Sequence, residues 1–322
     1  MTLTRVPSVG FIGLLVSLLL TACGGNSDRR KLVENAPSIS VTLTDQTDRT
    51  LQLPNRPQRI VSLAPNITEI LFAIGAGDKL VARSQACDYP ATVQSIPEVI
   101  TYPRLDLEQL KALEPDLIVT TDEIFTPDDI SMLERLGLPI YLQRYDSLAD
   151  VYRGMRELGK ILEVEAQAER VADSLMAIEA RVLDSTAGAV HYRTTMLVSG
   201  DPLKVVGGQG YLNQLIENAG GKNVFVDVAE AYPNTTVEQL LQLQTEYLIL
   251  PSKDRSVYQD LISQYPPLVN TPADVYKQVH VIDPDLLYRP GPRMLQGLLE
   301  LTHILHSRFN PQLFVDAPPA TP

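Results

Sequence analysis

A tyrosine and a glutamate recur with the same spacing in the two halves of this chain, and both residue types can bind a ligand or a partner. The sequence YPRLDLEQLKAL, residues 102–113, returns 130 residues later as YPNTTVEQLLQL, residues 232–243. In each copy the glutamate stands six residues after the tyrosine; the four residues are Tyr102, Tyr232, Glu108 and Glu238. Two copies are too few for a solenoid, which needs at least three. The repeat therefore predicts two similar lobes with a site between them.

The two tyrosines have the chemistry of a site for a ring-shaped ligand. Each stands just before a predicted helix and after a strand, on the side of an open α/β sheet where ligands bind. A tyrosine ring is flat and amphipathic, so Tyr102 and Tyr232 facing each other would contact a large ring. Packing of each ring under its own loop is the alternative. We predict that both tyrosines line a cleft between the lobes.

The two glutamates stand in the first turns of their predicted helices. A carboxylate there is favoured by the helix dipole, by a few tenths to about 1 kcal/mol, which would explain either one alone. It does not explain why both copies place the glutamate at the same position. Because arginine pairs with carboxylates through charge-assisted hydrogen bonds, we predict that Glu108 and Glu238 are exposed and dock a partner that carries paired arginines.

A third group of polar residues, Asp285, Tyr288 and Arg289, is followed by the sequence Pro-Gly-Pro-Arg. The Pro-Gly pair forces a turn before the last predicted helix. Arg289 can pair with a phosphate or a carboxylate of a ligand, whereas an ion pair with Asp285 that only holds the loop is the alternative. We assign these three residues to the ligand site together with the two tyrosines.

Short apolar strands alternate with helices through most of the chain, which predicts mostly parallel sheets covered on both faces. In the first half we expect a β-hairpin over residues 38–54 and strands at 59–65, 79–84, 115–121 and 139–145. A helix capped by Asn66 or Thr68 would place Glu69 in its first turn, where the helix dipole favours an anion. In the second half the expected strands are 194–200, 223–227, 247–250 and 278–283.

Between the two halves, residues 147–183 show helical spacing of apolar side chains and no strand signal. A polar stretch at 163–165 divides them into two helices, and the second, of about 20 residues, would be ~30 Å long. The predicted fold class is α/β, with two α/β sandwich lobes of mostly parallel sheets joined by one long rigid helix. The predicted divisions are an N-terminal lobe (38–146), a helical linker (147–186), a C-terminal lobe (187–310) and a disordered tail (311–322).

The N-terminus predicts export. Arg5 precedes an apolar run from Val9 to Leu20, which is too short for a membrane-spanning helix of about 20 residues and has the length of a secretory signal. The run ends in Leu-Thr-Ala-Cys-Gly, which resembles a bacterial lipobox, in which Cys23 would become the lipidated first residue. An ordinary signal peptide is the alternative. We predict a signal peptide at 1–22, a flexible tether at 23–37, and a membrane-anchored protein in the periplasm or on the outer face of the cytoplasmic membrane.

Composition argues against several classes of function. The chain has 39 acidic and 27 basic residues and a net charge of −12, whereas nucleic-acid binding needs a basic face. No Ser/His/Asp motif is present, so we expect no enzyme and no catalytic residue. With Cys23 lipidated, Cys87 has no disulfide partner and is predicted to be a packed or cleft-edge thiol. The histidines, which all stand in the second half, predict no metal site; they are His191, His280, His303 and His306.

Several segments together resemble the substrate-binding proteins of ABC importers for cobalamin, ferric siderophores and haem, which have the class III periplasmic-binding-protein fold. These segments are SLAPNITEILFAIGAGDKLVA, the CDYP turn, LEQLKALEPDLIV, NQLIENAGGKNVF, VEQLLQL and RPGPR, and the resemblance covers about residues 38–310. It implies a monomer with a ligand in a shallow cleft, no covalent cofactor apart from lipid, and an ABC permease with its ATPase subunits as partner. In that family a glutamate on each lobe binds arginines of the permease, and the motifs carry this role onto Glu108 and Glu238.

Among these proteins the chain resembles the cobalamin binders most. Tyr102 and Tyr232 stand where those proteins carry cleft tryptophans, and Asp285 and Arg289 stand at polar cleft positions. The chain has no tryptophan, and it departs from a cobalamin binder's aromatic residues at Ala86, Thr121 and Ser199. Cobalamin is the first ligand expected, and a ferric siderophore or haem the next. Haem needs an axial Tyr or His, for which Tyr102, Tyr232 or Tyr288 could serve.

Two other functions use a similar fold and remain alternatives. One is a ligand-sensing lobe that acts on a signalling partner through the same cleft. The other is a lobe that binds a zinc or manganese ion, which the positions of the histidines disfavour.

Overall fold

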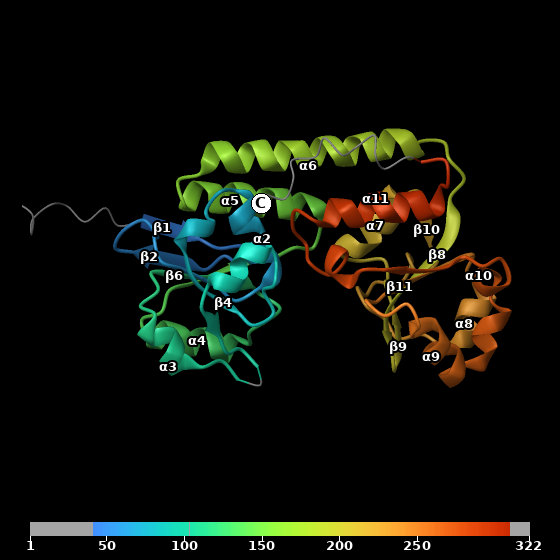
Figure 1. The fold of residues 1–322 in the computed structure, drawn as a ribbon, viewed down its shortest axis with the longest axis horizontal. Helices are drawn as coiled ribbons and strands as arrows, with labels where there is room; N and C mark the ends of the chain where they lie inside the picture. The colour runs from blue at the N-terminus through green and yellow to red at the C-terminus, as the bar shows by residue number, and fades with distance from the viewer. Residues whose placement is uncertain (1–40, 103, 310–322) are drawn as a thin grey trace, which may run out of the picture.

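Two parallel β-sheets, one in each half of the chain, form the centres of two lobes that lie side by side (Figure 1). The computed structural model describes residues 41–102 and 104–309. The predicted signal peptide (1–22), Cys23, the tether (23–37) and the tail (311–322) lie outside the described residues.

The N-terminal lobe is built on five parallel strands in the order β5-β4-β3-β6-β7. An antiparallel hairpin, β1 (Val41–Thr44) and β2 (Thr50–Leu53), precedes them as predicted. The sheet strands are β3 (Ile60–Ser62), β4 (Leu80–Ser84), β5 (Glu98–Val99), β6 (Leu117–Thr121) and β7 (Ile140–Gln143). The helices are α2 (Pro65–Ala73), α3 (Leu107–Ala112) and α4 (Pro127–Arg135), with 3-10 turns at Gly77–Lys79 and Ala91–Ser95.

The C-terminal lobe has four parallel strands in the order β10-β8-β11-β12, and β9 pairs antiparallel with β8. The strands are β8 (Tyr192–Gly200), β9 (Leu203–Val205), β10 (Gly221–Asn223), β11 (Tyr247–Pro251) and β12 (Val279–Ile282). The helices are α7 (Tyr211–Asn218), α8 (Val237–Gln242), α9 (Val257–Gln264), α10 (Pro272–Val275) and α11 (Met294–Leu305), with 3-10 turns at Pro266–Asn270 and Pro284–Leu286.

The two lobes share one topology, which confirms the internal repeat. In each sheet the lobe's first parallel strand is central: β3 lies between β4 and β6 with β7 at the edge, and β8 lies between β10 and β11 with β12 at the edge. The repeated phrase leads into α3 in one lobe and into α8 in the other. The two helices precede β6 and β11, which have matching positions in the two sheets, so the helices occupy equivalent places. In Figure 1 both lie on the side of the molecule away from α6.

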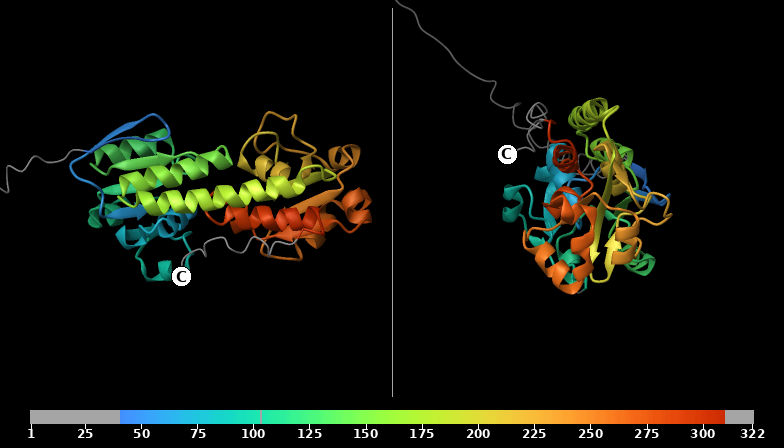
Figure 2. Two further views of the ribbon diagram at one scale, coloured as in Figure 1. Left: turned by 90° about the horizontal axis from the view of Figure 1, so that it is seen from above. Right: turned by 90° about the vertical axis from the view of Figure 1, so that its right-hand side faces the viewer.

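Two packed helices connect the lobes: α5 (Leu148–Ile161) and α6 (Glu165–Thr186). Helix α6 has 22 residues, which at 1.5 Å per residue makes it about 33 Å long, and it runs along both lobes beside α5 and α11 (Figure 2). Arg156 of α5 binds Glu169 and Asp173 of α6, each at 2.6 Å. A single cluster of buried apolar side chains runs from α2 through α5 and α6 to α7 and α11, so the lobes and the helical linker share one core.

Two local expectations are wrong. Helix α2 begins at Pro65 with Ala64 as its N-cap and no side-chain cap, so Asn66 and Thr68 lie inside the helix. Strand β10 ends at Asn223 instead of extending over 223–227, because the chain turns there. The amide of Asn223 donates to the carbonyls of Val206 and Gly207, at 3.2 and 3.0 Å, and its oxygen accepts from the Phe225 N–H. An Asn that bonds its own nearby backbone in this way favours a turn.

Candidate functional site

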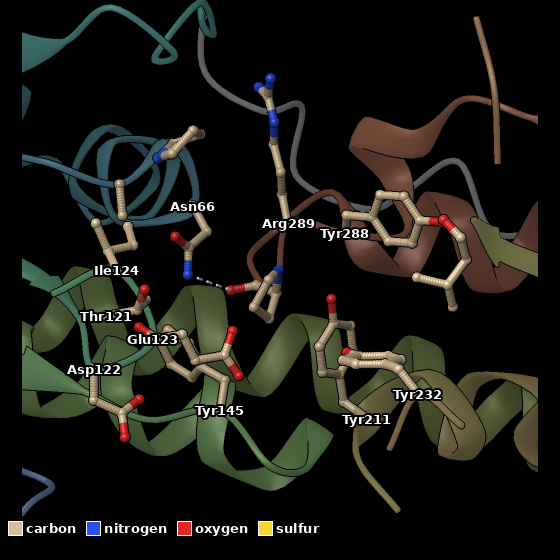
Figure 3. Close-up of a pocket in the computed structure, with 14 residues that line it drawn as sticks. Asn66, Thr121, Asp122, Glu123, Ile124, Tyr145, Tyr211, Tyr232, Tyr288 and Arg289 are labelled. Atoms are coloured by element: carbon tan, nitrogen blue, oxygen red, sulfur yellow. Dashed lines mark hydrogen bonds between the residues drawn. The ribbon is translucent and has the colours of Figure 1, made fainter. Parts of the chain in front are cut away.

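A cavity of about 360 Å³ lies between the two lobes, and Figure 3 shows the residues around it. On the N-terminal side it is lined by residues that end or follow β3, β6 and β7. On the C-terminal side it is lined by a residue of β8 and by loop and helix-start residues. The lining residues are Ala64, Pro65, Asn66, Thr121, Asp122, Glu123, Ile124, Tyr145, Val198, Tyr211, Tyr232, Tyr288, Arg289 and Pro290. The carboxyl ends of parallel strands thus face the cavity, as expected for an α/β ligand site.

Three tyrosines of the C-terminal lobe form one wall. The hydroxyl of Tyr211 donates to the Leu287 carbonyl at 2.9 Å, and that of Tyr288 lies 3.4 Å from the Val198 carbonyl. Tyr232 is 40% exposed, and its hydroxyl has no hydrogen-bond partner within residues 41–102 and 104–309. Burial, with a smaller contribution from Glu123, raises the pKa of Tyr232, so the phenol keeps its proton and can donate to a ligand.

A pair of glycines holds the loop that carries Tyr232. A Cβ on Gly207 would lie 2.0 Å from the carbonyl oxygen of Glu230, and one on Gly208 would lie 1.9 Å from that of Val226. No other residue type allows the backbone to approach so closely. The same Gly-Gly-Gln-Gly segment ends at Gly210, with φ of 87°, which is the N-cap of α7. The segment therefore turns the chain into α7 at Tyr211 and also supports the wall of the cavity.

Arg289 reaches across to the N-terminal lobe. Its guanidinium pairs with Glu69 at 3.1 Å, with Asp88 at 2.5 Å and with Asp285 at 3.1 Å. In Figure 3 the guanidinium points away from the tyrosines. Burial lowers the pKa of Arg289, but its hydrogen bonds to Asp88 and Glu69, together with the charges of Asp285 and Asp88, outweigh burial, and the pKa is raised. Asp285 also accepts from Lys253 at 2.7 Å and does not line the cavity.

The predicted place of Glu69 in the first turn of a helix is wrong, because α2 begins at Pro65 and Glu69 lies beyond its first turn. Glu69 is 3% exposed and binds Arg293 of the other lobe, with distances of 2.8 Å to Nε and 2.6 Å to Nη2. The Arg293 guanidinium also lies 4.1 Å from the ring centre of Tyr89. The sequence signal for this pairing is a glutamate inside the mostly apolar run Ile-Thr-Glu-Ile-Leu. A charge on a buried helix face needs a partner of opposite charge.

Only some of the predicted ligand residues line the cavity. Tyr232, Tyr288 and Arg289 line the cavity, whereas Tyr102 is 82% exposed and, like Asp285, is not among the lining residues. Tyr145 and Tyr211 line it but were not predicted. Both tyrosines sit within otherwise unremarkable strand-end and helix-start segments, so no local pattern indicates their role.

Glu108 and Glu238 are both exposed and stand in the first turns of α3 and α8. The helix starts are set by side-chain caps: Asp106 accepts from the Gln109 N–H at 2.9 Å and Thr236 from the Gln239 N–H at 3.3 Å. Hydrogen bonds at the start of α8, from its own backbone and from Thr236, lower the pKa of Glu238. The predicted exposure of the glutamates is confirmed, and their docking role stays a prediction.

Cys87 is a packed thiol, one of the two predicted positions. It is 1% exposed, and its Sγ lies 3.1 Å from the Ser84 hydroxyl. Burial raises the pKa of the thiol, which keeps it protonated and unreactive. Within the described residues no group of three or more His, Cys, Asp and Glu side chains could hold a metal ion. None of the helices in this part of the chain is long and apolar enough to cross a membrane.

Two α/β lobes with an open, tyrosine-lined cavity between them define a two-lobed ligand-binding protein. The sequence profile described as periplasmic binding protein matches residues 60–286. The chain belongs to this family and has its class III fold, as the sequence predicted.

Known relatives and solved structures agree with this assignment. The chain is 29% identical over 259 residues to the vitamin B12-binding protein of Vibrio parahaemolyticus, which covers 78% of this chain and 90% of the relative. It is 24% identical over 302 residues, 91% of this chain and 95% of the relative, to an uncharacterized ABC transporter substrate-binding lipoprotein of Bacillus subtilis. The structure is similar to a periplasmic haem-binding protein of Pseudomonas aeruginosa, with a TM-score of 0.72, 25% identity and coverage of 79% and 94% of the two chains.

Proposed function

We propose that this protein captures a large ring chelate, cobalamin first and haem or a ferric siderophore next, and delivers it to the permease of an ABC importer. The observation that carries the proposal is the inter-lobe cavity with tyrosines on both sides, Tyr145 from one lobe and Tyr211, Tyr232 and Tyr288 from the other. Mostly apolar walls with a few polar groups are typical of small-molecule sites. The relatives named above supply two of the ligand classes, vitamin B12 and haem.

Tyrosine rings suit a chelate of this kind. The hydroxyls of Tyr211 and Tyr288 lie near backbone carbonyls, so these residues present ring surface to the cavity. Tyr232 keeps a free hydroxyl and 40% exposure, which lets it contact a ligand through its ring and donate a hydrogen bond. If the ligand is haem, Tyr232 is the tyrosine of the cavity best placed to serve as its axial ligand.

Delivery needs a docking surface on each lobe. Glu108 and Glu238 occupy equivalent places in the two lobes, and both are exposed. They stand at the starts of α3 and α8, two helices that lie on the side of the molecule away from α6 (Figure 1). Their carboxylates suit paired arginines of a permease. Attachment of lipid to Cys23 would hold the protein at the membrane where that permease lies.

Ligand titration of the purified full chain in detergent tests the proposal. Cyanocobalamin, haemin and a ferric hydroxamate are added separately, and binding is followed by calorimetry and by quenching of tyrosine fluorescence, since the chain has 13 tyrosines and no tryptophan. We expect saturable one-to-one binding of at least one ligand with a Kd in the micromolar range or below. Absence of saturable binding of all three up to about 100 μM would overturn the proposal.

A further inference from the structure

Within residues 41–102 and 104–309, no cation pairs with the carboxylate of one side chain that lines the cavity. Glu123 follows β6 and lines the cavity, and Figure 3 shows its carboxylate pointing across toward Tyr211 and Tyr232. It also acts on both tyrosines electrostatically: burial raises the pKa of Tyr211 and of Tyr232, and the Glu123 charge adds to each shift. The carboxylate therefore faces the space that a ligand would fill.

The other charged residues of the lining are already paired. Asp122 binds Arg144 at 2.6 Å, and Arg289 is surrounded by the carboxylates of Glu69, Asp88 and Asp285. Glu123 has no hydrogen bond or ion pair within the part of the chain that the structure describes. Burial, followed by the nearby Asp122 and Asp146, raises the pKa of the Glu123 carboxyl, the direction expected in a field that no cation offsets.

A free carboxylate in a partly enclosed site discriminates between ligand edges. It accepts hydrogen bonds from amide N–H groups, and it repels another carboxylate at close range. Cobalamin carries carboxamide side chains around its ring, whereas haem carries two propionates. Among the described residues that line this cavity, the basic side chain is Arg289, whose guanidinium is already paired with carboxylates, so none is left to receive a propionate.

We propose that Glu123 is a specificity-determining residue, which selects ring chelates with amide donors at their edge over ring chelates with carboxylates. This inference rests on the proposed function and specifies the ligand class of the same site: an amidated corrinoid is favoured over a haem with free propionates. The Tyr232 hydroxyl, opposite Glu123, supplies a donor for an amide carbonyl of the same ligand edge.

Matched ligand pairs test this without assuming which chelate is natural. The first pair is cyanocobalamin and its monocarboxylic acids, in each of which one amide is hydrolysed to a carboxylate. The second is haemin and its dimethyl ester. For the wild-type protein we expect at least one corrinoid acid to bind about tenfold or more weakly than cyanocobalamin, and the ester to bind more tightly than haemin. The variant Glu123→Gln keeps the shape of the side chain and removes its charge. In this variant the difference in affinity within each ligand pair should fall to about twofold or less.

The control variant is Asp128→Asn, which removes an exposed acid from the start of α4, outside the cavity. It should keep the wild-type preferences, and thermal unfolding should show that both variants are folded. The inference is overturned if every acid binds as tightly as its parent, if haemin binds more tightly than its ester, or if the preferences persist in Glu123→Gln. If neither cyanocobalamin nor haemin nor a ferric hydroxamate binds the wild-type protein, it is the proposed function that fails.

Discussion

Replacing Glu69 by Gln should destabilise the protein by far more than loss of a surface ion pair. Glu69 and Arg293 have side chains that are 1% and 11% exposed, and they join the two lobes through contacts of 2.6 and 2.8 Å. Loss of the carboxylate leaves the Arg293 guanidinium buried without its counter-charge. Removing one partner of a buried pair costs about 3–5 kcal/mol, because the remaining charge stays desolvated.

Thermal and urea unfolding of the full chain measure this cost. At about 2–4 °C for each kcal/mol, the midpoint should fall by roughly 6–20 °C. The matched control is Glu163→Gln, which breaks an ion pair with Arg56 whose two side chains are 56% and 46% exposed. The control should lose no more than about 1 kcal/mol, because water screens an exposed pair.

A second variant checks the mechanism. If the cost comes from the unpaired guanidinium, replacing both residues, Glu69→Leu with Arg293→Leu, should recover most of the lost stability, because apolar side chains carry no desolvated charge. Arg289 keeps Asp88 and Asp285 in this double variant. An unfolding midpoint of Glu69→Gln that equals that of Glu163→Gln would refute the reasoning.

Three further predictions concern binding, docking and anchoring. Tyr232→Ala should weaken binding of the natural ligand by about 1–3 kcal/mol in calorimetry, because one large contact surface is lost. Tyr102→Ala should weaken binding by the same amount if Tyr102 also contacts the ligand. Unchanged affinity in either variant would remove that residue from the site. Glu108→Arg combined with Glu238→Arg should leave ligand affinity intact and abolish stimulation of the importer's ATPase, so normal transport by this variant would refute the docking role. Cys23→Ser should accumulate as unprocessed or soluble protein in membrane fractionation, and a variant that fractionates like the parent would show that Cys23 is not the anchor.

Local patterns in the sequence determined the architecture. Alternating strands and helices predicted two parallel-sheet lobes, and the repeated phrase predicted that α3 and α8 occupy equivalent places. The start of α3 could be predicted from the sequence because its cap is local: Asp106 accepts a hydrogen bond from the backbone N–H of Gln109, three residues later. The exposure of Glu108 and Glu238 followed from the same first-turn position. These features depend on residues a few positions apart, which is the range over which backbone hydrogen bonding and side-chain periodicity act.

The lining of the cavity was decided only by tertiary structure. Glu69 and Arg293 are 224 residues apart in the chain, and no local pattern indicates that they meet or that Arg289 turns toward Asp88. The tyrosine wall has the same origin: the loop that carries Tyr232 reaches the cavity by packing closely against Gly207 and Gly208. Contacts of this kind depend on how two lobes pack around a shared helical core, where close packing selects one arrangement among many that the local sequence allows.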